Sequence, residues 1–163
     1  MDEKVLHNST IERLTNQHRI IPTFIEGLSN EALHQRINAN KWSIHENLAH
    51  LGRYQDFFEK RLILILKEKS PKFDRYKAEE DPMHDKWIQL NLSDILLAID
   101  RQRDSLKNFV VALTGKKMKR TGIHPKLGQM DIPMWTEFFL LHEAHHLYAV
   151  FQISQEMKKR ANG

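Results

Sequence analysis

The sequence has no cysteine among its 163 residues, and this absence removes several classes of function. Without thiols there is no disulfide framework, no thiolate metal site and no cysteine nucleophile. Long apolar runs are missing too, since no uncharged stretch approaches the length of a membrane span, about 20 residues. The opening MDEKVLHNSTIERL lacks the apolar region of a signal peptide. We therefore expect a cytoplasmic protein that does not partner a membrane.

The net charge of +4 is local rather than general. The excess basic residues lie in one apparent loop and in the tail: Lys116, Lys117, Lys119, Arg120 and Lys126, then Lys158, Lys159 and Arg160. Such patches can bind phosphate, which would suit a nucleic-acid-binding module. The rest of the chain is slightly acidic, and no aromatic residues interleave with the basic ones. We favour a solvated loop and a helix C-terminus whose charges suit the helix dipole.

Four segments show apolar residues at helical spacing, with no strong strand signal and no internal repeat. They run from Ser9 to Leu28, from Ser43 to the residue before Pro71, from Ser93 to Leu113, and from Asp131 to Ile153. A chain of this length fits one domain, residues 1–163. The pattern predicts an all-α fold, a four-helix bundle with long connections.

Local signals mark where these helices begin and bend. Ser9 with Glu12, and Ser43 with Glu46, form the sequence pattern of a capping box. Pro22 should kink the first segment because it lacks an amide hydrogen. We expect the first two helices to begin at the two serines.

The connections differ in character. The polar link from residue 29 to 41 has room for a short helical turn, and residues 71–85 look like an exposed, charged connection. The loop GKKMKRTGIHPKLGQMD leads to Asp131, a candidate cap, with Pro133 in the first turn of the last helix. Two of these links are long, so strict up-down-up-down topology is not required.

Histidines stand out in the last segment, where LLHEAHHL at residues 140–147 matches H-E-x-x-H. His142 and His146 lie on one helix face, at positions where the apolar stripe predicts a hydrophobic residue. Burying one imidazole without partners costs about 1–3 kcal/mol. The spacing leaves two explanations open: a metal site, or two core histidines with hydrogen-bond partners. His145 borders the same face and is an alternative ligand to His146.

A third ligand must come from another helix, and His50 is the candidate. It lies one position from the apolar stripe of the second segment, so it could face the last helix or simply pack at the interface. Three imidazoles from two helices would leave open positions for water or substrate. Protons should compete with the metal for such ligands near pH 6.5, about the pKa of free histidine.

A zinc peptidase would need more than the H-E-x-x-H match. Glu156 is the only carboxylate after His146, and the motif has no Gly-x-x-His extension. Glu143, the base in such peptidases, should point about 60–100° around the helix away from the metal. We also expect no sheet for a peptide substrate to extend. The sequence therefore argues against a peptidase.

Three short segments resemble the motifs of one family. KWSIHENLAHL at residues 41–51 resembles W-S-x-x-E-x-L-x-H-L, HPKLG at 124–128 resembles H-P-x-L-G, and HEAHHL at 142–147 resembles H-D-x-x-H-L. They follow the order found in the DinB/YfiT-like superfamily, which the chain resembles from Ile11 to Gln155. The chain departs from the last motif at Glu143, where the family has aspartate.

This resemblance implies a four-helix bundle, often a homodimer, with a divalent metal such as zinc or nickel held by three histidines. Carried over residue by residue, the ligands are His50, His142 and His146. Relatives include transferases and isomerases that use a low-molecular-weight thiol, and others look like metal-dependent hydrolases. We therefore expect a metal-dependent small-thiol transferase or hydrolase acting on a small molecule. The alternative is a non-enzymatic metal-binding bundle in stress response.

Two further residues have competing roles. His124, in the His-Pro pair, fits a turn that enters the last helix, where Pro125 fixes the backbone and Gly128 supplies a positive φ. The other reading places His124 at the mouth of the site. We favour the turn, and we likewise favour packing over substrate contact for Trp42.

Overall fold

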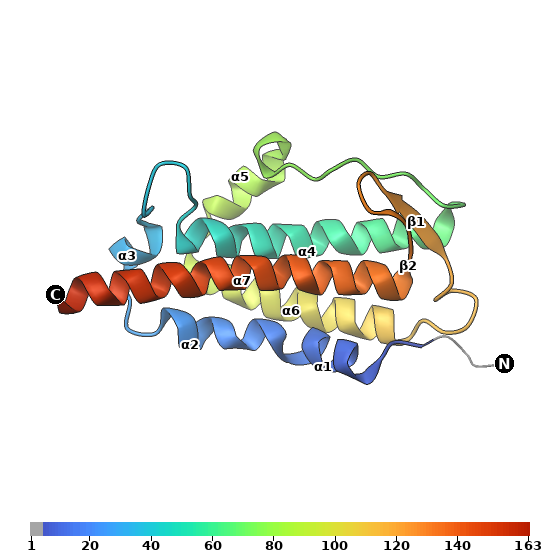
Figure 1. Cartoon of the computed structure of the whole chain (residues 1–163), viewed down its shortest axis with the longest axis horizontal. Coiled ribbons are helices and arrows are strands. Elements are labelled where there is room, and N and C mark those ends of the chain that lie inside the picture. Colours follow the sequence, from blue (N-terminus) through green and yellow to red (C-terminus); the bar gives the residue numbers. More distant parts are fainter. Residues whose placement is uncertain (1–4) are drawn as a thin grey trace.

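The computed structural model describes residues 5–163. Residues 1–4, which open the stretch compared above with signal peptides, lie outside the described residues. The helices are α1 Asn8–Asn16, α2 Ile21–Ile25, α3 Asn30–His34, α4 Ile44–Lys67, α5 Pro82–Ile88, α6 Leu92–Val111 and α7 Ile132–Asn162, with 3₁₀ turns at Gln17–Ile20 and Ala78–Glu80. Figure 1 shows α1–α2, α4, α6 and α7 packed lengthwise as a four-helix bundle, which confirms the predicted fold class. None of the helices in residues 5–163 combines the length and apolar character that a bilayer span requires.

The helix caps explain where the long helices begin. Ser43 and Glu46 form the predicted capping box of α4. Asp131 caps α7 by accepting from the Met134 amide at 3.1 Å. The predicted capping box of Ser9 with Glu12 is wrong. Helix α1 begins at Asn8, because the His7 side chain accepts from the amide of residue 9 and serves as the cap.

The first predicted helical segment, Ser9 to Leu28, is interrupted near Pro22, as expected. Gln17–Ile20 forms a 3₁₀ turn, and α2 restarts with Pro22 in its first turn. Because Pro22 cannot donate a backbone hydrogen bond, the α-helical ladder breaks in the turn before it. The short helix α3 fulfils the expectation of a helical turn in the polar link that follows.

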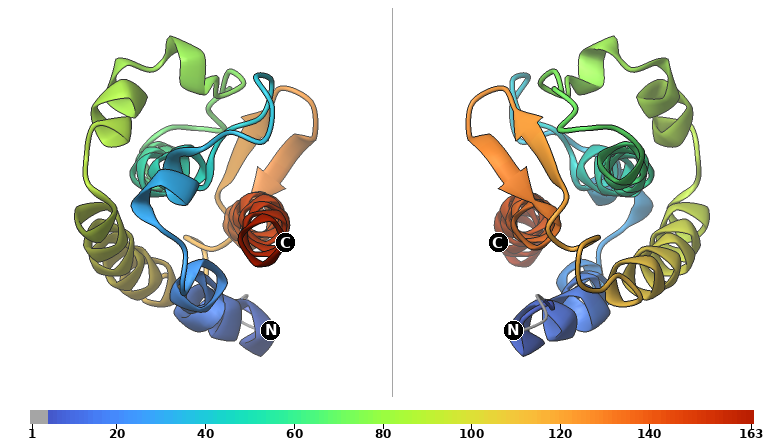
Figure 2. Two further views of the ribbon diagram at one scale, coloured as in Figure 1. Left: turned by 90° about the vertical axis from the view of Figure 1, so that its left-hand side faces the viewer. Right: turned by 90° about the vertical axis from the view of Figure 1, so that its right-hand side faces the viewer.

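The four helices do not alternate in direction. In Figure 1, α1–α2 and α7 run from right to left, whereas α4 and α6 run from left to right. The end-on views place α4 between α6 and α7, with α1–α2 closing the ring (Figure 2). Because the neighbours α4 and α6 are parallel, residues 68–91 must cross back along the bundle. This crossover is less exposed than expected, since it contains α5 and buries Ala78 and His84.

A small hairpin corrects the prediction of no strand. Strands β1 Thr121–His124 and β2 Gly128–Asp131 pair antiparallel beside α7. The start of the crossover joins them, since Phe73 N donates to Ile123 O at 3.0 Å. The strands are too short and polar to show a period, and contacts from a distant segment stabilise them. Residues 124–128 are therefore the hairpin turn, with Gly128 at φ 80°, rather than a turn entering a helix.

The interior contains apolar side chains and one buried polar network. Arg103 on α6 is fully buried and donates to Gln55 Oε1 at 2.6 Å and to Leu14 O at 3.2 Å. It also forms an ion pair with Glu143 of α7. Each partner reduces the cost of burying the guanidinium, so the network ties α1, α4, α6 and α7 together.

Candidate metal centre

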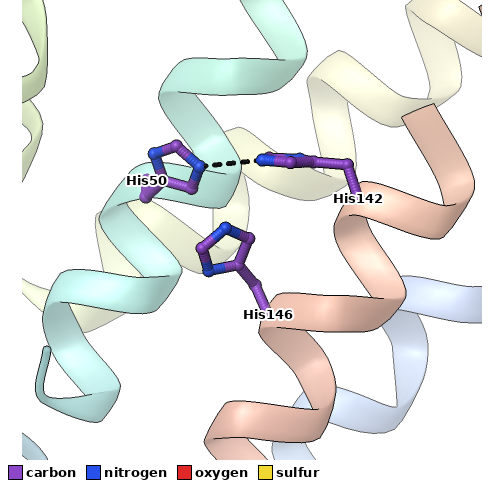
Figure 3. Close-up of side chains that lie close together, drawn as sticks. All are labelled: His50, His142 and His146. Atoms are coloured by element: carbon purple, nitrogen blue, oxygen red, sulfur yellow. Dashed lines mark hydrogen bonds between the residues drawn. The ribbon is translucent and has the colours of Figure 1, made fainter. Parts of the chain in front are cut away.

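Three imidazoles from two helices converge between α4 and α7 (Figure 3). His50 projects from α4, and His142 and His146 project from successive turns of α7. The Nε2 atoms of His50 and His142 are 3.1 Å apart, and one ring nitrogen from each of the three lies within 4.8 Å of the others. We call these residues the histidine triad. His145 is outside it, exposed beside the His146 ring.

Asn47 fixes the tautomer of one triad member. Its Nδ2 donates to Ser43 O at 2.8 Å, so its Oδ1 is the acceptor that faces His146 Nδ1 at 2.9 Å. The proton of His146 therefore sits on Nδ1, and Nε2 presents a lone pair to the triad. The backbone that holds Asn47 in place is the capped first turn of α4.

The spacing of the triad fits a metal ion. Two nitrogens bound to a tetrahedral zinc, each about 2.0–2.1 Å from it, lie about 3.3 Å apart. The observed Nε2–Nε2 separation of 3.1 Å between His50 and His142 is close to this value. Their Nδ1 atoms are buried with no hydrogen-bond partner among the described residues. A cation shared by the Nε2 atoms would offset part of the cost of burying these rings.

Burial keeps the triad neutral. It lowers the pKa of His50 to about 2, with smaller contributions from His146 and His142. Burial likewise lowers the pKa of His142 to about 3 and that of His146 to about 4. Neutral imidazole is the form that binds metals. These pKa values place proton competition at a lower pH than the 6.5 expected for free histidine.

The triad forms part of the wall of a cavity of about 680 Å³, which we call the site cavity. Trp42 stacks at 5.9 Å from the His146 ring and lies 5.0 Å from His50, so it packs on the triad and also lines the cavity. Tyr54 lies 3.9 Å from His142, ring centre to ring centre. The cavity thus has three ligand nitrogens beside an aromatic surface.

The crossover closes one side of the site cavity. Tyr76 lies 5.7 Å from His50, and its hydroxyl donates to Asp81 Oδ2 at 2.9 Å. Arg53 of α4 donates to the same carboxylate oxygen at 2.6 Å. These bonds anchor the segment that contains the 3₁₀ turn Ala78–Glu80 over the triad. Tyr76 could not be assigned a role from its sequence context, because nothing in the local pattern reveals that residues 68–91 fold back over α4.

Other histidines also meet the site. His124, at the end of β1, lines the site cavity, so the reading that places it at the mouth is supported over a role in the turn alone. His84 of α5 is buried, 5.3 Å from the Trp42 ring and 5.8 Å from the His50 ring. The sequence assigned no role to His84, and only the path of the crossover brings it near.

Glu143 points to a different side of α7 from the triad, toward the helical core. It is buried against Arg103 and accepts from Gln17 Nε2 at 3.0 Å. Burial raises its pKa, and Arg103 opposes the shift. A peptidase base must reach the metal-bound water, and this carboxylate is committed to the core. The geometry therefore agrees with the argument against a peptidase.

A helical bundle with a crossover between parallel helices, and a three-histidine cluster shared by α4 and α7, defines the class of protein. The family model described as the DinB superfamily matches residues 13–150, so the chain belongs to this superfamily. The uncharacterized protein YuaE of Bacillus subtilis (strain 168) is 26% identical over 147 residues, covering 83% of this chain and 91% of YuaE. The structure of YfiT from Bacillus subtilis superposes with a TM-score of 0.76 at 18% identity, covering 93% of this chain and 87% of YfiT. YfiT is described as a probable metal-dependent hydrolase with an unusual four-helix bundle topology.

Proposed function

We propose that this protein is a metal-dependent enzyme acting on a small molecule, with His50, His142 and His146 holding a divalent ion. The observation that carries the proposal is the convergence of the triad in the wall of an open cavity. Three protein ligands leave at least one position free, as in catalytic metal sites. Zinc and nickel are the first candidates because both bind imidazole well.

When bound, the metal would lower the pKa of a ligand water or thiol and so supply a nucleophile at neutral pH. Asn47 keeps the proton on His146 Nδ1 and leaves Nε2 available. Trp42, Tyr54 and Tyr76 would bind the apolar part of the substrate and exclude water from it.

We favour hydrolysis as the reaction, in line with the description of YfiT. Small-thiol transfer would use the same centre with a thiol in place of water. Because the chain contains no cysteine, that thiol would have to be a separate molecule. Addition of small thiols to the assay separates the two reactions, since only transfer depends on them.

The first experiment is elemental analysis of the protein purified without added metal or a histidine tag. Near-stoichiometric zinc or nickel is expected, with a sharp loss in His50→Ala, His142→Ala and His146→Ala. His145→Ala is the matched control, because this exposed neighbour lies outside the triad and should retain the metal. Wild-type metal content in His50→Ala would overturn the proposed ligand set.

The second experiment measures turnover of a panel of chromogenic esters and other electrophiles, with and without low-molecular-weight thiols. Holo-protein, metal-stripped protein and His146→Ala are compared. Metal-dependent turnover without thiol supports the hydrolase. Full metal occupancy with no turnover on any substrate would favour the non-enzymatic metal-binding bundle. The homodimer implied by the family stays a prediction, which light scattering can check.

A further inference from the structure

The site cavity contains a second polar group outside the triad, the Arg61 guanidinium. Arg61 lies on α4, about 16 Å along the helix axis from His50 at 1.5 Å per residue. Side chains on a helix lean toward its N-terminus, which brings the guanidinium back over Phe57, 4.5 Å from the ring centre. Arg61 therefore lines the same cavity as the triad while being only 5% exposed.

The charge of Arg61 is poorly compensated by the protein. Its Nη2 donates to the backbone carbonyl of Asp74 at 2.5 Å, and the guanidinium packs on Phe73 and Trp135. Within residues 5–163 no carboxylate lies within 4.0 Å of it, whereas the fully buried Arg103 pairs with Glu143. An arginine has five N–H donors, and among residues 5–163 the Arg61 side chain has one hydrogen-bond acceptor, Asp74 O.

His124 offers a neutral donor in the same region. Its Nδ1 accepts from the amides of Lys126 at 3.1 Å and Leu127 at 3.0 Å, which leaves the proton on Nε2. Burial and the nearby Arg61 both lower the pKa of His124, so the ring stays neutral. The His124 ring and the Arg61 guanidinium each lie 5.8 Å from the Trp135 ring.

The remaining N–H groups of a buried guanidinium that has no carboxylate partner must bond to water or to an anion. The cavity lets either of these reach Arg61. Arginine binds carboxylate and phosphate through two parallel N–H bonds, and a neutral N–H beside it adds a third donor. The cavity lining also includes the cations Arg75, Lys77 and Lys126 against one carboxylate, Glu79, so its net positive charge would attract an anionic ligand.

We propose that Arg61 and His124 bind an anionic group of the substrate, a carboxylate or a phosphate, at the end of the site cavity away from the triad. The substrate is then an elongated small molecule with its anion at Arg61 and its reacting group at the histidine triad. The position of the reacting group rests on the proposed function, whereas the anion site does not.

The test uses metal-free protein, so that no anion can bind to a metal. Inorganic phosphate and succinate are titrated separately by calorimetry into the wild type, Arg61→Gln and Lys60→Gln. Lys60 is the matched control, because it precedes Arg61 on α4, carries the same charge and is exposed in a pair with Asp56. Arg61→Gln should weaken binding at least about tenfold, and Lys60→Gln should change it less than about threefold. Tighter binding of phosphate or of succinate identifies the anion class.

A direct measurement guards against misfolding of the Arg61 variant. In the wild type, the NMR signal of the Arg61 Nε–H should shift on titration with the better-bound anion. Equal weakening by Arg61→Gln and Lys60→Gln, or no shift of this signal at saturating anion, would overturn the proposal.

The metal and anion sites can fail separately. Anion binding that persists in His146→Ala, together with no metal in the wild type, would refute the proposed function and leave the anion site standing. Anion binding that appears only after metal is added, and that survives Arg61→Gln, would refute the anion site alone.

Discussion

Asn47→Leu should weaken metal binding while leaving the bundle folded. Asn47 is buried at 4% exposure, and its Oδ1 is the acceptor for His146 Nδ1–H at 2.9 Å. Leucine has a similar volume and favours a helix, but it offers no acceptor. The variant therefore leaves the His146 ring free to rotate or to place its proton on Nε2, where it blocks coordination.

The size of the effect on metal affinity follows from the lost bond to His146, since the other bond of Asn47, to Ser43 O, does not contact the triad. Removing a hydrogen-bond partner of a metal-ligating histidine typically lowers metal affinity about 10–100-fold, which is about 1.4–2.7 kcal/mol. Competition against a colorimetric chelator measures this change. Asn47→Asp is the control, because it keeps an acceptor at the same place and should bind metal at least as tightly as the wild type.

Circular dichroism separates loss of affinity from loss of fold. Asn47→Leu should keep the helical spectrum of the wild type. A metal affinity within about threefold of the wild type in this variant, well below the change expected for a lost ligand partner, would refute the assignment of Asn47 as the residue that sets the His146 tautomer.

Three further predictions concern stability. Arg103→Met should cost about 3–5 kcal/mol in urea unfolding, because it leaves Glu143 buried without its cation. Since burial raises the pKa of Glu143, the deficit should grow as pH rises above the pKa of a free glutamate, where the unfolded carboxyl ionises and the buried one resists ionisation. The metal-free protein should lose stability as pH falls below about 6.5, because the unfolded histidines take up protons at that pH and the folded triad does not. The loss should reach up to about 1.4 kcal/mol per pH unit for each imidazole. Melting curves recorded at several pH values measure it. Gly52→Ala should reduce the free energy of unfolding by about 1–3 kcal/mol, because the added Cβ would collide with the Trp87 ring of α5. The melting temperature should fall accordingly.

Each of these three stability predictions would be contradicted by a specific result. An Arg103→Met cost under about 1 kcal/mol would show that the network contributes little against the expected loss for a broken buried pair. Metal-free stability that stays flat between about pH 6.5 and 5 would contradict the lowered pKa values of the triad. An unchanged melting temperature in Gly52→Ala would show that α5 can move away from α4 without loss of stability, which would contradict the cost expected for overpacking this contact.

The bundle and the triad are accessible from sequence because their signals are local. Helical periodicity and caps such as Ser43 and Asp131 act within one or two turns. His142 and His146 share a helix face at fixed spacing, and the family motif supplied His50. The misplaced start of α1 has a local cause as well, since His7 serves as a cap although histidine is not a typical cap residue.

The walls of the site cavity were not accessible in the same way. Tyr76 and His84 reach the site only because α4 and α6 are parallel and the chain must cross back between them. Asn47 lies three residues before His50 on α4, but its bond to His146 depends on how two helices are rotated about their axes. The hairpin that carries His124 has strands of four residues each and depends on contact with Phe73, so no periodic pattern marks it.

The metal-binding residues lie on long helices, whereas much of the cavity wall lies on connecting segments, and this difference affects how the site can change among related proteins. The triad is held by two long helices whose other faces form the core, so its geometry changes only if the bundle changes. The crossover and the hairpin supply much of the cavity wall, and most of their residues lie outside the two apolar core clusters. Sequence changes in residues 68–91 and 115–131 can therefore reshape the chamber around a fixed metal. Relatives that share the triad need not share a substrate, and substrate selectivity should be sought in those two segments.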